Sequence, residues 1–107
     1  MSLYRAHELL VAGYLSRIVI VSLEAAAALF ALFRTEDNPQ AAYHAAYAVA
    51  SQLDCLLEHH AVPSEDVYRN LVPDANEHQL SVIRFALEAC LVGVLNGRAA
   101  AVTAHVN

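Results

Sequence analysis

Histidine and carboxylate side chains are the residues of this 107-residue chain best suited to metal chemistry. Six histidines are present, and two of them directly follow an acid, in Glu58-His59 and Glu77-His78. Helical carboxylate sites use Glu-x-x-His pairs on facing helices, and helical zinc proteases use His-Glu-x-x-His. Neither spacing occurs in the sequence. We therefore expect no metal and no cofactor, and interpret the histidines as solvated side chains near helix ends.

A second candidate for chemistry is the pair Arg98 and His105, which has six residues between its members. This spacing resembles the Arg-x(4–6)-His motif of HEPN-type ribonucleases, and residues 41–47 (Ala-Ala-Tyr-His-Ala-Ala-Tyr) are similar to the aromatic-alanine helix of that family. The resemblance implies a helical dimer in which two Arg/His pairs meet to cleave RNA. Ala99 stands where family members usually carry a polar residue. A HEPN-like ribonuclease using Arg98 and His105 is the enzymatic alternative.

Three side chains that could hold a small ligand share one flank of a helix expected over residues 39–60. They are Tyr43, Tyr47 and Asp54. Tyrosines more commonly pack at the edge of a core, with the hydroxyl group in water. A small-ligand-binding helical bundle, with a closed apolar cavity near Tyr43 and Tyr47, is therefore a further alternative.

The charge balance argues against nucleic-acid binding. The net charge is −5, and all six basic residues are arginines that form no cluster. Nucleic-acid binding needs a basic stripe that displaces counterions from phosphates. We therefore expect no DNA partner. The absence of lysine and the abundance of alanine are typical of a GC-rich bacterial genome.

The most apolar stretch has the length of a membrane span but not its composition. A span needs about 20 residues with few charges, and residues 14–33 contain Arg17 and Glu24. A charge near the middle of a span costs a few kcal/mol. We expect neither a span nor a signal peptide. Cys55 and Cys90 belong to no Cys-x-x-Cys motif, which indicates free thiols and a cytoplasmic location.

Glycine and proline divide the sequence into helical segments within one domain, residues 1–107. We expect long helices from Leu3 to Arg34 (interrupted or kinked at Gly13), from Pro39 to His60 and from Ala75 to Leu95, with a short helix from Glu65 to Leu71. Asp74 and Glu77 resemble a capping box, and Asn96-Gly97 is a stop signal. No segment alternates as a strand does. The predicted fold is all-α, an antiparallel bundle of three long helices and one short one.

Two of these helices are apolar on nearly all sides. The helix over residues 75–95 has one apolar stripe (Leu80, Ile83, Leu87, Cys90, Leu91, Val94) and a second on its reverse (Val82, Phe85, Ala89, Val92). Residues 18–33 repeat this design around Glu24. A domain of about 100 residues buries only some two-thirds of its unfolded surface, and exposed apolar patches mark contacts with partners. We therefore expect a homodimer, the commonest assembly, or a complex with another protein.

The expected interface uses the outer faces of the first and last long helices. Its residues are Arg17, Val21, Glu24, Ala28, Val82, Phe85, Ala89 and Val92. Arg17 and Glu24 lie roughly 10.5 Å apart along one straight helix, too far to pair within a chain. In an antiparallel pair of these helices, Arg17 of one copy would meet Glu24 of the other. The sequence thus favours a non-enzymatic interaction or regulatory module.

Overall fold

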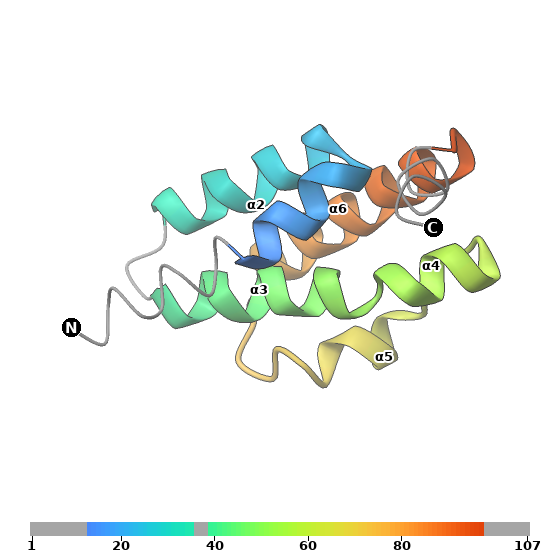
Figure 1. Ribbon diagram of the computed structural model, residues 1–107. Helices are drawn as coiled ribbons and strands as arrows, with labels where there is room; N and C mark the ends of the chain where they lie inside the picture. The colour runs from blue at the N-terminus through green and yellow to red at the C-terminus, as the bar shows by residue number, and fades with distance from the viewer. Residues whose placement is uncertain (1–12, 36–38, 98–107) are drawn as a thin grey trace.

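The computed structural model describes residues 13–35 and 39–97 (Figure 1). Within these ranges the chain is mostly helical and contains no strand, which confirms the all-α prediction. The helices are residues 13–21, α2 (Leu23–Thr35), α3 (Pro39–Ser51), α4 (Leu53–His59), α5 (Glu65–Arg69) and α6 (Glu77–Leu95). The expected helix start near Leu3 lies outside the described residues.

The first long helix is interrupted at Ser22, where we did not expect a break. Ser22 Oγ accepts a hydrogen bond from Ala25 N at 3.1 Å, as an N-cap residue does. Ser22 N donates to Ile18 O at 2.8 Å, so the preceding turn ends on the same residue. The chain bends sharply there (Figure 1). Gly13 is the first described residue, so the expected interruption there lies at the edge of the described chain and stays a prediction.

The second long helix is divided at Gln52. Gln52 N donates to Val49 O at 3.0 Å, a tighter turn than the α-helical one, and α4 starts one residue later. His60 ends α4 in the left-handed conformation (φ 52°) and is exposed. The expected set of three long helices is thus not confirmed.

The third long helix closely matches its predicted range. Asn76, rather than Asp74, is its N-cap: Asn76 Oδ1 accepts from Gln79 N at 2.8 Å, and Gln79 Oε1 accepts from Asn76 N at 2.9 Å. This reciprocal pair is a capping box that starts two residues later than predicted. Gly97 follows the helix with φ 81°, a conformation that favours glycine, so the predicted stop is confirmed.

The core is built around the buried stripe of α6. Leu80, Ile83, Leu87, Cys90 and Val94 are all buried, as their spacing predicted. α2, α3 and α4 all pack on this stripe of α6, and α2 also contacts α3 (Figure 1). α5 lies beside α4 and contributes buried Tyr68. Along residues 39–60, the buried residues Ala42, Ala46, Val49, Leu53 and Leu56 recur at helical spacing and face this core.

Among the described helices, α6 alone is long and apolar enough to cross a membrane. The core helix of a soluble protein passes the same test of length and composition. Here α6 buries one side against α2, α3 and α4.

Candidate interaction surface

A groove between α2 and α6 is the surface on which the predicted interface residues gather. It holds a shallow pocket of about 320 Å³. The lining residues, which we call the α2–α6 groove, are Glu24, Phe85, Ala89, Val92, Gly93 and Asn96. Four of these belong to the predicted interface. The structure therefore brings together residues that lie more than 60 positions apart in sequence.

Small residues on α6 let the bend at Ser22 come close to the groove. A Cβ added to Gly93 would collide with the Val21 carbonyl oxygen and lie 3.1 Å from the Val21 carbonyl carbon. Only glycine permits this approach of two backbones. Because the bend starts α2, Gly93 fixes where α2 begins along α6. Gly93 and Asn96 were missed in the sequence; the signal for Gly93 was a glycine inside an otherwise apolar helix.

The apolar side chains of the groove remain exposed. Phe85 is 51% exposed and Val92 56%, while Ala89 is half-buried between them. A single exposed phenylalanine is common on protein surfaces. Here the large side chains of Phe85 and Val92 form a ridge, and the smaller Ala89 leaves a hollow beside it. This shape suits contact with another helix.

Glu24 lies in the first turn of α2, exposed at the end of the groove. Its Oε2 accepts a hydrogen bond from Ser22 Oγ at 3.2 Å. An acid in the first turn also interacts favourably with the helix dipole. The charge that interrupts the apolar run is thus explained within one chain. The straight helix on which the Arg17–Glu24 pairing between copies was based does not exist, because the chain bends between these residues.

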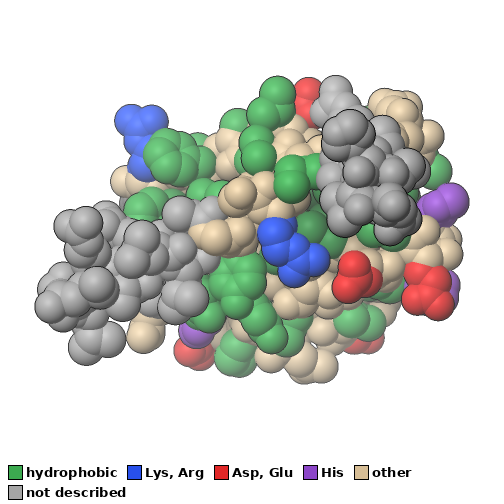
Figure 2. Space-filling view, in the orientation of Figure 1, with side chains coloured by type: hydrophobic (Ala, Val, Ile, Leu, Met, Phe, Trp, Pro, Cys, Tyr) green, Lys and Arg blue, Asp and Glu red, His purple; other side chains and the backbone are tan. Residues whose placement is uncertain are grey.

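The other predicted interface residues do not line the α2–α6 groove. Val21 is only 5% exposed and belongs to the core of the single chain, so it is unavailable to a partner. Arg17 is exposed on the helical segment 13–21, and Ala28 and Val82 are half-buried. Apolar side chains near the bend, which we did not assign, are also exposed: Val19, Ile20 and Leu23. Figure 2 shows hydrophobic side chains reaching the surface over α2 and this segment.

The tyrosines predicted to line a pocket instead pack on a third tyrosine. Tyr14 lies 5.7 Å from Tyr43 and 5.5 Å from Tyr47, measured between ring centroids. A side-chain hydrogen bond with Tyr14 raises the pKa of Tyr43, which keeps its phenol protonated. Asp54 is exposed on α4, beyond the break at Gln52. These tyrosines therefore tie residues 13–21 to α3.

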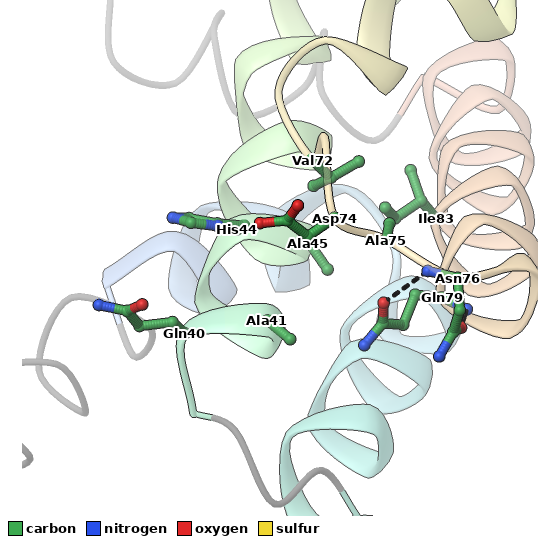
Figure 3. Close-up of a pocket in the computed structure, with 10 residues that line it drawn as sticks. All are labelled: Gln40, Ala41, His44, Ala45, Val72, Asp74, Ala75, Asn76, Gln79 and Ile83. Atoms are coloured by element: carbon green, nitrogen blue, oxygen red, sulfur yellow. Dashed lines mark hydrogen bonds between the residues drawn. The ribbon is translucent and has the colours of Figure 1, made fainter.

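A second concavity, of about 190 Å³, lies between α3 and the start of α6 (Figure 3). We call it the α3–α6 cleft. Its buried wall consists of Ala45, Val72 and Ile83, and its rim carries Gln40, His44 and Asp74. The capping-box residues Asn76 and Gln79 close one side. Tyr43 and Tyr47 do not line it.

The charged side chains of α5 and α6 form a small surface network. Arg69 donates to Glu65 at 2.6 Å, and Arg84 donates to the other oxygen of Glu65 at 3.1 Å. The hydrogen bond from Arg69, aided by Arg84, lowers the pKa of Glu65. Arg84 on α6 thus reaches across to α5. This network joins two elements but contains no nucleophile or base in a cleft.

Both residues suggested for catalysis, Arg98 and His105, lie outside the described part of the chain. Within residues 13–35 and 39–97, no three His, Cys, Asp or Glu side chains are placed to hold a metal ion. Cys90 is buried and Cys55 is half-buried, and both are free thiols. No family model, curated protein or solved structure matches this chain.

Proposed function

We propose that this protein is a non-enzymatic interaction module that forms a homodimer through the α2–α6 groove. The observation that carries the proposal is the exposed apolar ridge of Phe85 and Val92 beside a pocket floored by Ala89 and Gly93. A ridge next to a hollow is self-complementary, because a two-fold axis places each ridge opposite the partner's hollow.

The spacing along α6 supports a specific arrangement. Phe85 and Gly93 each lie four residues from Ala89, one on either side. An axis through Ala89 in an antiparallel pair of α6 helices brings each Phe85 to the level of the partner's Gly93, where the exposed groove residues Val92 and Asn96 lie. Small residues at the crossing let two helices approach closely. Burying Phe85 and Val92 then supplies the main driving force, at about 25 cal/mol for each Å² of apolar surface.

Charge substitution on the ridge tests the proposal. Phe85→Asp is expected to abolish the dimer, because a carboxylate would be buried against an apolar partner. Val67→Asp is the matched control: Val67 is 49% exposed, nearly the same as Phe85, but lies on α5. Sedimentation velocity should show a dimer for wild type and Val67→Asp, and a monomer for Phe85→Asp. Loss of the dimer in both variants, or in neither, would contradict the assigned surface.

Cysteine cross-linking tests the position of the axis. Ala89→Cys in a Cys55→Ser background should form a disulfide between copies under mild oxidation, since residues near a two-fold axis meet their own equivalents. Native Cys90 is buried and does not interfere. Val67→Cys in the same background should remain uncross-linked. If the dimer forms but Ala89→Cys gives no cross-link, the two-fold axis does not pass near Ala89.

A further inference from the structure

We propose that Tyr14 and Tyr43 form an oxidative cross-linking site, at which a one-electron oxidant joins their rings by a carbon–carbon bond. The product is a dityrosine that ties residues 13–21 covalently to α3. Neither tyrosine lines the α2–α6 groove, and this inference does not depend on the dimer. It rests on how the tyrosine rings of the two elements meet.

Tyrosines are concentrated at this contact. Of the five in the chain, three meet there: Tyr14 from residues 13–21, and Tyr43 and Tyr47 from α3. The centroid of the Tyr14 ring lies 5.7 Å from that of Tyr43 and 5.5 Å from that of Tyr47. Rings in contact have centroids about 4.5–7 Å apart. Tyr14 and Tyr43 are half-buried and Tyr47 is exposed, so an oxidant in solution has access to the cluster.

The orientation of the rings selects the pair of Tyr14 and Tyr43. Dityrosine forms between the ring carbons next to the hydroxyl-bearing carbon, so the two rings must meet at their hydroxyl edges. A side-chain hydrogen bond joins Tyr14 and Tyr43, which brings these edges together. Tyr47 is placed less well. Its ring stacks on that of Tyr43 with 25° between the planes, and it meets the Tyr14 ring edge to face at 79°.

The coupling removes two electrons from the chain. Each phenol gives up one electron and its hydroxyl proton, which leaves two phenoxyl radicals. The radicals pair their electrons in a new bond between the two ortho carbons. Each of these carbons then releases its hydrogen as a proton while the oxygen takes up a proton, so both phenols are restored. The oxidant gains two electrons, water gains two protons, and the chain becomes lighter by two hydrogen atoms.

The cross-link would act as a staple on the fold. Tyr14 and Tyr43 are 29 positions apart and enclose the bend at Ser22 and the whole of α2. A covalent bond across such a loop removes conformations from the unfolded chain, as a disulfide does. The cross-linked protein should therefore melt at a higher temperature than the untreated protein.

Photo-oxidation followed by peptide mapping tests the site. Light, tris(bipyridine)ruthenium(II) and persulfate supply a one-electron oxidant, and trypsin then cuts after arginine. Tyr14 falls in peptide 6–17 and Tyr43 in peptide 35–69. We expect these two peptides to be joined within a single chain, at their summed mass less two hydrogen atoms. Absence of this product from the oxidised, folded protein would overturn the proposal.

Phenylalanine variants identify the partner of Tyr14, because Tyr43 and Tyr47 share one tryptic peptide. Phenylalanine keeps the ring that packs but removes the hydroxyl group that is oxidised. Tyr43→Phe should lose the cross-link, whereas Tyr47→Phe should retain it. Tyr68→Phe is the matched control and should also retain it, since Tyr68 lies in the same peptide but is buried on α5. A cross-link that survives Tyr43→Phe, or disappears in Tyr47→Phe, would refute the assigned pair.

Oxidation of the unfolded chain separates this site from the general reactivity of tyrosine. In concentrated urea the yield of the Tyr14–Tyr43 product should fall at least about tenfold, because the fold no longer holds the two rings together. An equal yield in urea would show that the folded geometry is not responsible. After oxidation, the melting temperature should rise in wild type and stay unchanged in Tyr43→Phe. A cross-linked wild-type chain that melts no higher than the untreated one would refute the staple.

Discussion

Ser22 shows how one hydroxyl group can redirect a chain. It is fully buried, accepts from Ala25 N and donates to the Glu24 carboxylate, so its polar atoms have partners where α2 begins. Serine competes with the helical backbone for hydrogen bonds. In the sequence it appears as a single polar residue in an apolar run, and its role as a cap was not recognised.

Removing this hydroxyl group should destabilise the fold. We expect Ser22→Ala to lower the free energy of unfolding by about 1 kcal/mol, the usual value of an N-cap. Urea denaturation followed by circular dichroism measures the change. Ser81→Ala, an exposed serine on α6, should have little effect. Equal stability of Ser22→Ala and wild type would show that the bend does not depend on the cap.

The two thiols should differ in reactivity. Burial raises the pKa of Cys90 to about 12, and the thiolate is the reactive form, so Cys90 stays protonated and shielded at pH 9. Cys55 is half-buried. Iodoacetamide at pH 8 should therefore modify one thiol in the folded protein and both in urea, as mass spectrometry would show. Rapid modification of Cys90 in the folded protein would contradict its place in the core.

The raised pKa of Cys90 also predicts how the free energy of unfolding changes at high pH. A raised pKa in the folded state means that the unfolded thiol ionises first as the pH rises. Stability is therefore fully present below pH 9, the ordinary value, and falls as the pH approaches about 12. Cys90→Ala should remove this part of the pH dependence in urea denaturation. If stability falls equally steeply with pH in wild type and in Cys90→Ala, the fall is due to other groups, such as Tyr43.

At the scale of elements, the close approach at Gly93 determines how the bend sits on α6. Gly93→Ala would gain up to about 1 kcal/mol in helix propensity. The new Cβ would collide with the Val21 backbone, and overpacking costs about 1–3 kcal/mol. We therefore expect net destabilisation. Gly13→Ala meets no atom within 4 Å and should be neutral or stabilising, and thermal denaturation compares the two. Greater stability of Gly93→Ala would rule out the tight contact.

The sequence predicted some elements well and others poorly, for physical reasons. α6 was found nearly intact because proline, a cap and Asn96-Gly97 bound it. The breaks at Ser22 and Gln52 carry no proline or glycine, and they depend on tertiary packing and on local hydrogen bonds. The cap at Asn76 was placed two residues early because Asp74 is an equally good capping type.

The groove could be predicted in part at the residue level. The apolar reverse of α6 identified Phe85, Ala89 and Val92 correctly as exposed or half-buried. Val21 could not be separated from them by periodicity, because the bend rotates the residues before Ser22 relative to those after it. Gln79 gave no signal, since its burial depends on the helix start and on α3.

For the whole molecule, dimerisation should raise the thermal stability of the fold. If dimerisation buries the α2–α6 groove, mass action makes the melting temperature rise with protein concentration. Calorimetry on wild type should show this rise, and Phe85→Asp should show none. A melting temperature independent of concentration in both proteins would argue that the groove stays open.

The proposed dimer predicts a molar mass that can be measured on the wild-type chain in solution. Light scattering across a dilution series should give twice the chain mass of 11.6 kDa at high concentration. A constant 11.6 kDa up to the highest concentration, with helical circular dichroism intact, would contradict the proposed dimer.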